Sequence, residues 1–333
     1  MPSAFLNGID LVYDDTGGDG EPVVLVNGTG ASRTTWRAHQ TSALSDAGYR
    51  VIAPENRGLP PNVLPPGGIT LEAMAADVAA LIDHLALAPC RIVGFSLGSA
   101  IVGELLASRP ELVHQAVLMA GRARPDTFGS ALGQARRELH DSGADVPASH
   151  RAVFSALCYL SPHTLRDPRA ISDWLDVFTY APGENGPGVR AQYDAMGDTD
   201  RLDRYATIDV PLLCIGFSDD VMISPLATQE IARTVPGARY TEIARAGHFG
   251  HLERPAEVNA ALLGFFAERP RARPMMPTPP TPGEVPHDPP YPRRGRPPSP
   301  PPGKGCGSSP DASGTGPRSP RSPSSADSST SSR

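Results

Sequence analysis

Short apolar runs alternate with helical patterns through the first 120 residues, and no other feature constrains the fold as strongly. Four runs are nearly continuous in Val, Ile and Leu, as in strands buried on both faces. They span Pro22–Val26, Arg50–Ala53, Arg91–Phe95 and Ala116–Met119. Between the second and third runs, Thr70 is placed to cap a helix whose apolar residues follow the helical period. This repetition predicts a doubly wound α/β domain, with a mostly parallel sheet covered by helices on both faces.

Further strand patterns lie on either side of this region. Residues Phe5–Tyr13 contain an Asn-Gly turn signal and predict an antiparallel hairpin at the edge of the sheet. Strand patterns return at Pro211–Ile215 and Arg239–Ile243, and a final helix is predicted over Pro255–Glu268. The sheet therefore resumes after a long interruption.

The interruption, from residue 122 to residue 204, has no strand pattern. Short amphipathic helices are predicted there at Leu132–Leu139, Ala152–Leu160 and Ala170–Tyr180. We therefore predict a core formed by residues 1–121 and 205–269, interrupted by a helical lid, or cap, over residues 122–204.

Residues 270–333 differ in composition from the rest of the chain. They hold 19 of the 38 prolines and are otherwise rich in Ser, Gly and Arg. Such a segment buries too little apolar surface to offset its ordering entropy, so we predict a disordered tail. A solvated extension is the main interpretation, and a docking arm in the polyproline II conformation at Pro297–Pro302 is the alternative.

Charge and cysteine content bound the partners and the compartment. Residues 1–269 carry 21 basic and 32 acidic side chains, an excess of acid that does not suggest a nucleic-acid partner. No run of 18 apolar residues and no basic leader followed by an apolar run occurs, so we expect no membrane partner and a cytoplasmic location. The four cysteines lie far apart without CxxC spacing, so disulfides are not implied.

Ser96 is the strongest candidate for a catalytic residue. It lies in Gly94-Phe95-Ser96-Leu97-Gly98, which joins a predicted strand to a helix that continues to about Ser108. This is the G-x-S-x-G pattern in the strand–turn–helix context that the pattern requires. A serine at so sharp a turn is lifted toward a cleft beside a helix N-terminus, whose partial charge favours a developing oxyanion.

A serine nucleophile needs a base, and His248 is the candidate. Of the nine histidines, it is the one with a predicted strand before it and a helix after it. That context places it at the carboxyl edge of the sheet, where α/β proteins bind ligands. A metal pair with His251 is a weaker interpretation, because no third ligand accompanies the two and the serine motif would stay unexplained. We therefore expect no metal and no cofactor.

The acid that orients the base is expected after the strand Pro211–Ile215, where two aspartates are adjacent. Counting from that strand or back from Pro225 favours Asp220, whereas the spacing from Gly216 favours Asp219. We prefer Asp220, and Asp219 then needs no role beyond loop capping or solvation.

Two backbone N–H groups are the expected oxyanion donors. That of Leu97 follows the serine, and that of Thr29 lies in a loop of small residues directly after the strand Pro22–Val26. A dinucleotide-binding fingerprint is the rival interpretation of this loop, but Arg33 stands at its third glycine position.

With these residues in place, the chain resembles the α/β-hydrolase superfamily over about residues 4–268. The order Ser96, Asp220, His248 is the order of that family's triad. Residues 54–58 resemble its acidic-x-Arg-Gly turn, and residues 247–255 resemble its G-H-x-x-x-x-E-x-P pattern. The resemblance implies an α/β-hydrolase fold with the insertion as the lid.

Two departures and one narrower likeness qualify this resemblance. Asn27 stands where the family commonly has histidine before the oxyanion glycine, and Ser99 stands where a second glycine commonly follows Gly98. Both are compatible with catalysis, because Asn can hydrogen-bond the loop and Ser is small. The stretches 55–61 and 160–174 resemble hydrolases encoded among bacterial secondary-metabolite genes.

Together these features predict a serine hydrolase that cleaves an ester, thioester or lactone of a small apolar acyl group, free or carrier-bound, through an acyl-enzyme on Ser96. The alternatives are an acyltransferase on the same triad and a ligand-binding protein without turnover. Six lid aromatics are candidates to line the acyl pocket: Phe154, Tyr159, Trp174, Phe178, Tyr180 and Tyr193.

Overall fold

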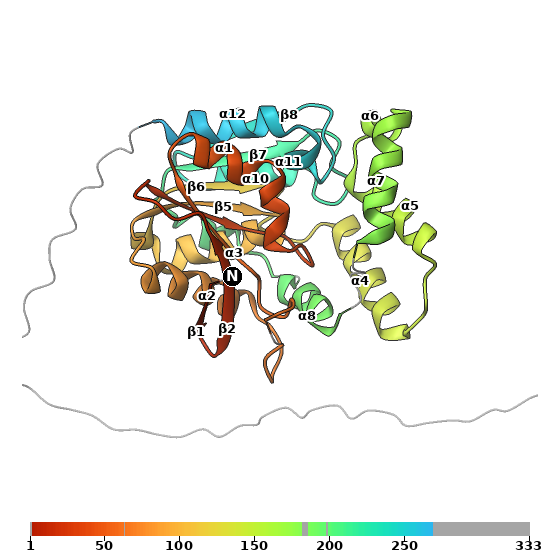
Figure 1. Ribbon diagram of the computed structural model, residues 1–333, viewed down its shortest axis with the longest axis horizontal. Helices are drawn as coiled ribbons and strands as arrows, with labels where there is room; N and C mark the ends of the chain where they lie inside the picture. The colour runs from red at the N-terminus through yellow and green to blue at the C-terminus, as the bar shows by residue number, and fades with distance from the viewer. Residues whose placement is uncertain (1, 63, 182–185, 198, 269–333) are drawn as a thin grey trace, which may run out of the picture. The chain divides into compact units, whose positions relative to one another are not determined.

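The structure, a computed structural model, describes residues 2–62, 64–181, 186–197 and 199–268. Within them, eight strands form one sheet in the order β1-β2-β4-β3-β5-β6-β7-β8 (Figure 1). The pairs β1–β2 and β2–β4 are antiparallel, and the other neighbours are parallel. The strands are β1 (Ser3–Leu6), β2 (Ile9–Asp15), β3 (Pro22–Val26), β4 (Arg50–Pro54), β5 (Cys90–Phe95), β6 (Val113–Met119), β7 (Leu212–Phe217) and β8 (Arg239–Ile243).

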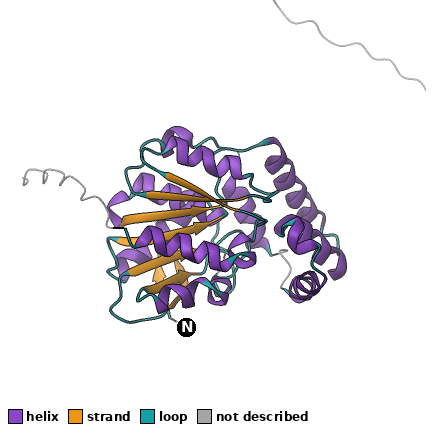
Figure 2. Ribbon diagram, turned by 90° about the horizontal axis from the view of Figure 1, so that it is seen from above, coloured by secondary structure: helices purple, strands orange, loops and turns teal. Residues whose placement is uncertain are grey.

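Helices cover both faces of the sheet (Figure 2). In β3, Val24 and Val26 belong to the hydrophobic cluster that includes α2, α3 and α10, whereas Val23 and Leu25 belong to the cluster that includes α1 and α12. The predicted α/β fold is thus confirmed. The helices are α1 (Gln40–Asp46), α2 (Leu71–His84), α3 (Leu97–Ser108), α10 (Pro225–Thr234) and α12 (Pro255–Phe266).

Each predicted strand is present, and the differences lie at the ends. The strand β6 begins at Val113, whereas the sequence predicted its start at Ala116. His114 and Gln115 are polar and interrupt the apolar run, so the first residues of the strand were not predicted. The hydroxyl of Thr70 accepts a hydrogen bond from the N–H of Ala73 at 3.1 Å, so this residue caps α2 as expected.

Between β6 and β7 the described residues form helices and no strand, in agreement with the pattern in the sequence. The helices are α4 (Thr127–Ser142), α5 (Ala148–Tyr159), α6 (Pro162–Leu165), α7 (Pro168–Tyr180), α8 (Pro187–Met196) and α9 (Leu202–Tyr205). The sequence did not indicate α8, whose Pro-Gly start and polar composition conceal it. The shorter elements elsewhere are η1 (Arg33–Ala38), η2 (Pro110–Leu112) and α11 (Gly250–Glu253). The predicted tail, 270–333, lies outside the described residues.

The helix α8 is joined to the core by a close approach of two glycines. Gly58 follows β4 with a φ of +84°, a conformation that favours glycine. A Cβ at Gly188, near the start of α8, would overlap the carbonyl group of Gly58. This contact fixes α8 against the turn after β4, next to the loops at the carboxyl edge of the sheet.

A buried ion pair holds the same turn from the other side. The Arg57 guanidinium donates two hydrogen bonds to the carboxylate of Asp77 in α2, one of them at 2.6 Å, and both side chains are 6% exposed. Asn7 adds a hydrogen bond to Asp77 at 2.8 Å. Burial raises the pKa of Asp77, and the guanidinium opposes that shift. The pair therefore connects the hairpin, the turn after β4 and α2.

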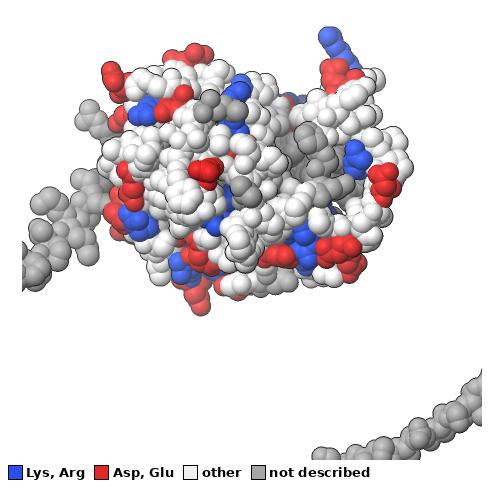
Figure 3. All heavy atoms as spheres, turned by 60° about the horizontal axis from the view of Figure 1, so that its bottom comes forward, with Lys and Arg blue, Asp and Glu red and all other residues white. Residues whose placement is uncertain are grey.

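A second buried ion pair joins Arg33 to Glu55 at 2.6 Å, and many of the other pairs lie at the surface. On the face shown in Figure 3, basic and acidic side chains are interspersed. Arg190 in α8, for example, pairs with Asp141 at 2.9 Å. None of the helices in the described ranges combines the length and the apolar character needed to cross a bilayer.

We expect Asp77→Ala to lower the free energy of unfolding by about 3–5 kcal/mol, because it leaves the Arg57 charge buried without its carboxylate. Asp83→Ala on the same helix is the matched control, since the Asp83 side chain is 52% exposed and its removal should cost less than about 1 kcal/mol. Urea unfolding followed by circular dichroism measures both. Equal effects of the two substitutions would contradict the importance of the buried pair.

Candidate active site

Ser96 occupies the sharp turn between β5 and α3. Its φ of +54° and ψ of −117° lie outside the regions that non-glycine residues favour. Side chains on either flank would not fit, because a Cβ at Gly94 would overlap the carbonyl of Gly98, and a Cβ at Gly98 would overlap the carbonyl of Val26. The hydroxyl of Ser99 lies 2.8 Å from the carbonyl oxygen of Gly94, so it can donate within the turn. The strained backbone is thus fixed from several sides.

The structure brings His248 to this serine. Its Nε2 lies 3.1 Å from the Oγ of Ser96, although 152 residues separate the two along the chain. The imidazole is 3% exposed and lies on the loop that follows β8. A hydroxyl at this distance can donate its proton to the ring nitrogen.

Of the two adjacent aspartates, Asp220 faces the imidazole. Its Oδ2 lies 2.8 Å from Nδ1 of His248, and the carboxylate is fully buried. The second oxygen, Oδ1, accepts the backbone N–H groups of Met222 at 2.8 Å and Ile223 at 2.9 Å. These bonds fix the carboxylate in the orientation that the imidazole requires. No contact between Asp219 and His248 occurs among the described hydrogen bonds and ion pairs.

Asn27 organises the loop after β3. Its Oδ1 accepts the N–H of Gly28 at 2.8 Å, and its Nδ2 donates to the carbonyl of Ser32 at 2.8 Å. Gly28 lies against Ser96, because a Cβ there would come within 3.1 Å of the serine Cβ. Thr29 and Ser96 line the same pocket. Leu97, at the start of α3, and Thr29, on the loop after β3, therefore both lie beside Ser96.

Gln192, on α8, is a site residue that the sequence did not reveal. Its Oε1 accepts the N–H of Gly30 at 2.9 Å, and its Nε2 donates to the carbonyl of Arg57 at 3.0 Å. The side chain is fully buried. It links the helical insertion to the loop that carries Thr29, and no local motif marks a glutamine for such a role.

Glu253 and Phe249 join the histidine loop to the insertion. Glu253 accepts the N–H of Gly247 at 2.6 Å through one oxygen and the N–H of Ser161 at 2.9 Å through the other. The ring of Phe249 stacks on that of Tyr159 with the centroids 4.4 Å apart. Glu253 belongs to the G-H-x-x-x-x-E-x-P pattern recognised in the sequence, but nothing in the sequence indicated that it binds Ser161. The loop that carries His248 is therefore held by Tyr159 at the end of α5 and by Ser161, the N-cap residue of α6.

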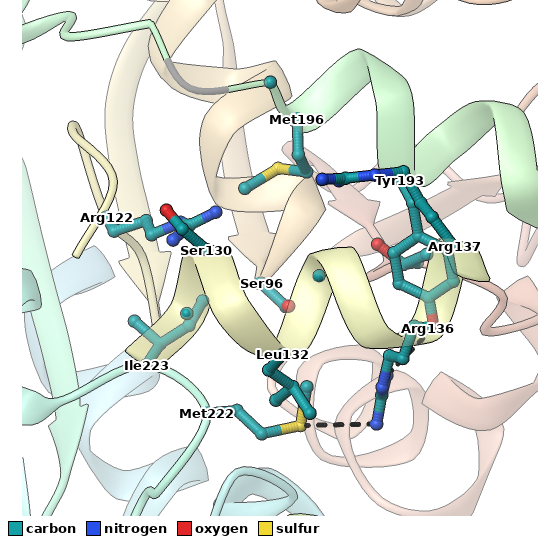
Figure 4. Close-up of a pocket in the computed structure, with 14 residues that line it drawn as sticks. Ser96, Arg122, Ser130, Leu132, Arg136, Arg137, Tyr193, Met196, Met222 and Ile223 are labelled. Carbon is teal, nitrogen blue, oxygen red and sulfur yellow. Dashed lines mark hydrogen bonds between the residues drawn. The ribbon is translucent and has the colours of Figure 1, made fainter. Parts of the chain in front are cut away.

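Ser96 opens into a pocket with about 610 Å³ of empty space, part of it continuous with solvent. Its walls come from α4, α8, the loop after β3 and the loop after Asp220 (Figure 4). The apolar part of the wall comes from Leu132, Met196, Met222 and Ile223. Three arginines also line it: Arg122, Arg136 and Arg137.

The six lid aromatics are distributed differently from the expectation. Tyr193 is the member of that set in the wall of the pocket with Ser96, among the described lining residues. Trp174 and Phe178 pack against Phe249, next to His248 in the chain, as Tyr159 does. Phe154 and Tyr180 are 42% and 84% exposed. Helical spacing could not show which side of each short helix faces the core.

His251 lies beneath the site in an apolar setting. It is 1% exposed, and its ring centroid lies 4.2 Å from that of Phe95 and 5.2 Å from that of Trp36. Burial, together with the nearby His248, lowers the pKa of His251 to about 3. The imidazole is therefore neutral at neutral pH.

The described residues contain no group of three or more His, Cys, Asp or Glu side chains arranged to hold a metal ion. Cys90, Cys158 and Cys214 are buried and are not joined by disulfides, and Cys306 lies outside the described residues. Burial raises the pKa of the Cys90 and Cys214 thiols to about 12, so both are un-ionised at neutral pH.

The chain is similar to known proteins in both sequence and structure. The sequence profile described as "Alpha/beta hydrolase family" matches residues 23–261. The "Putative non-heme bromoperoxidase BpoC" of Mycobacterium tuberculosis is 44% identical over 259 residues, which are 78% of this chain and 98% of that protein. The crystal structure of that protein matches with a TM-score of 0.75, covering 78% of this chain and 96% of the other.

Two further proteins are less similar. The "Putative carbamate hydrolase RutD" of Variovorax paradoxus is 29% identical over 75% of this chain and 92% of its own length. The enol-lactonase from Burkholderia xenovorans LB400 is 26% identical, with a TM-score of 0.69, over 80% of this chain and all of the other.

The buried imidazole of His251 should make stability depend on pH. Because its folded pKa of about 3 lies below the ordinary value of 6.5, only the unfolded chain binds a proton between these values. Its contribution is complete above pH 6.5 and is lost as pH falls, by at most about 1.4 kcal/mol per pH unit. Urea unfolding at pH 7 and pH 5 measures this slope.

We expect His251→Gln to reduce that slope and His163→Gln, at an exposed position of α6, to leave it unchanged. The slope is compared, rather than the free energy itself, because the His251 substitution also changes packing. The same slope in His251→Gln and in the wild type would contradict the assignment.

Proposed function

The chain belongs to the alpha/beta hydrolase family, and from this premise we propose that it is a serine hydrolase acting on carboxylic esters, thioesters or lactones. The observation that carries the proposal is the continuous set of hydrogen-bonded side chains Ser96–His248–Asp220. The names of several relatives also describe hydrolases, with carbamate and enol-lactone as the substrates given.

In the proposed reaction, the Oγ of Ser96 forms a bond to the acyl carbon while its proton passes to Nε2 of His248. The tetrahedral intermediate collapses, the bond to the leaving oxygen or sulfur breaks, and the imidazolium returns the proton to that atom. Water, deprotonated by the same nitrogen, then cleaves the acyl-enzyme and releases a carboxylic acid. Asp220 orients the imidazole and stabilises its charged form.

The negative oxygen of the intermediate needs donors that are in place before the reaction. We assign this role to two backbone N–H groups beside Ser96, that of Leu97 at the start of α3 and that of Thr29 on the loop after β3. Asn27 and Gln192 hold the loop after β3, so they are positioning residues for Thr29.

We further propose that residues 122–204 act as the lid. Their helices contribute pocket walls through α4 and α8, and Tyr159 of α5 and Ser161, before α6, contact the His248 loop. A carrier-bound acyl group stays a prediction from the sequence.

A second candidate is acyl transfer to a nucleophile other than water. The printed name of BpoC, a non-heme bromoperoxidase, favours testing hydrogen peroxide in that role, because peroxide attacking the acyl-enzyme would release a peroxyacid that can oxidise bromide. Product analysis with and without peroxide and bromide separates the two reactions. A ligand-binding protein without turnover is the third candidate, and it should react with no acyl ester.

Removing the nucleophile should abolish turnover. We expect Ser96→Ala to lower kcat on a p-nitrophenyl acyl ester by about 10⁴-fold or more and to prevent labelling by a fluorophosphonate probe. Peptide mass mapping of the wild type should locate the label on Ser96. Labelling of a different residue, or retained turnover in the variant, would refute the proposal.

The adjacent aspartates provide a matched pair of variants. We expect Asp220→Asn to lower kcat by about 10⁴-fold, because the amide no longer stabilises the imidazolium or its tautomer. Asp219→Asn removes the same charge one position earlier and should change kcat by less than about threefold, since no described hydrogen bond or ion pair joins the Asp219 carboxylate to His248. Steady-state kinetics decide, and a larger loss in Asp219→Asn would reverse the assignment.

A further inference from the structure

We propose that Gly133 on α4 determines the size of the acyl group that the site accepts, and that an unbranched apolar acyl chain lies along α4 across Gly129 and Gly133. The inference rests on the proposed hydrolysis at Ser96. It adds to that function a specificity-determining residue and the shape of the substrate.

One face of α4 forms a wall of the pocket that contains Ser96 (Figure 4). The residues that this helix contributes to the wall are Gly129, Ser130, Leu132, Gly133, Arg136 and Arg137. All six are half-buried, whereas the other positions of α4, apart from His140, are exposed. At 3.6 residues per turn, the two glycines lie one above the other in the middle of this face. A furrow without side chains therefore runs along the centre of the wall.

The space above Gly133 is open toward the pocket. Apart from the adjoining residues and the backbone of its own helix, a Cβ at Gly133 would meet one described atom, the Nη1 of Arg137 at 3.4 Å. That atom is the far end of a flexible side chain. Gly98 and Gly188 differ, because a Cβ at either would overlap a backbone carbonyl of another segment. The absence of a side chain at Gly133 thus leaves pocket space rather than allowing a backbone contact.

A larger side chain at this position would enter the furrow. Side chains of a helix lean toward its N-terminus and cover the residue four positions earlier, which here is Gly129. A leucine in place of Gly133 would therefore lie over Gly129, inside the pocket. Replacing a glycine within a helix also favours the helical conformation, so such a variant changes the pocket without weakening α4.

The proton transfers of the reaction place the acyl group, rather than the leaving group, on this side of Ser96. His248 returns its proton to the leaving atom, so that atom lies on the side of Nε2. The described lining of the pocket includes Ser96 and Thr29 but not His248. A group that extends from the reacting carbon into this pocket is therefore the acyl chain. The apolar side chains available to it are Leu132, Met196, Met222 and Ile223.

The test uses two series of esters and compares kcat/KM for a long and a short member of each. The acyl ratio is that of p-nitrophenyl hexanoate to p-nitrophenyl acetate, and the alcohol ratio is that of hexyl acetate to ethyl acetate. We expect Gly133→Leu to lower the acyl ratio by about tenfold or more, since one methylene group in an apolar pocket has an effect of this size. The alcohol ratio should stay within about twofold of the wild type, because the leaving group lies outside this pocket.

Gly264→Leu is the matched control. Gly264 also lies within a helix, α12, but it is exposed, and a Cβ there would meet no described atom within 4 Å. We expect this variant to change neither ratio. An unchanged acyl ratio in Gly133→Leu, or a loss confined to the alcohol ratio, would overturn the inference, and so would a wild type that cleaves the acetate ester but not the hexanoate ester.

Failure of the proposed function gives a different result, because hydrolysis of neither p-nitrophenyl ester, or equal hydrolysis by Ser96→Ala, refutes that function and the inference with it. Should circular dichroism show that Gly133→Leu does not fold, Gly133→Ala gives a second measurement, since alanine favours a helix more than glycine does. We expect it to lower the acyl ratio by about threefold or more. The wild-type ratio in this variant would overturn the inference.

Discussion

The constraint on which the site depends is the backbone turn at Ser96, held at a positive φ between a parallel strand and a helix. This turn is possible because Gly94 and Gly98 lack side chains, so the backbones of β5, α3 and the end of β3 can come into contact. The sheet on one side and α3 on the other then determine where the hydroxyl points. The parallel order places the loops after β3, β7 and β8 at the same edge, so that Asn27, Asp220 and His248 meet there.

A second layer of contacts comes from the helical insertion and acts on loops rather than on the reacting atoms. Gln192 fixes the loop after β3, while Ser161 and Tyr159 hold the loop of His248 through Glu253 and Phe249. Each contact joins residues that are distant in sequence. The insertion therefore positions both the loop that carries Thr29 and the loop that carries His248.

The sequence predicted the parts of this arrangement that local chemistry dictates. Continuous apolar runs marked the buried strands, and the glycines around Ser96 marked a turn that other residues cannot form. The choice between the adjacent aspartates stayed open, because only the path of the loop after β7 determines which carboxylate faces His248. Gln192 gave no signal at all, since its partners are backbone groups more than 100 residues away.

The same limit explains why the sequence suggested an apolar pocket. Counting aromatic residues in the insertion identifies side chains that can be buried. It does not show which side of each short helix faces Ser96. In the structure Tyr193 lies in the wall of the pocket, whereas Tyr159, Trp174 and Phe178 pack around Phe249 on the loop of His248. Under the proposed function, the aromatic content of the insertion then serves to position the His248 loop as much as to exclude water from the pocket.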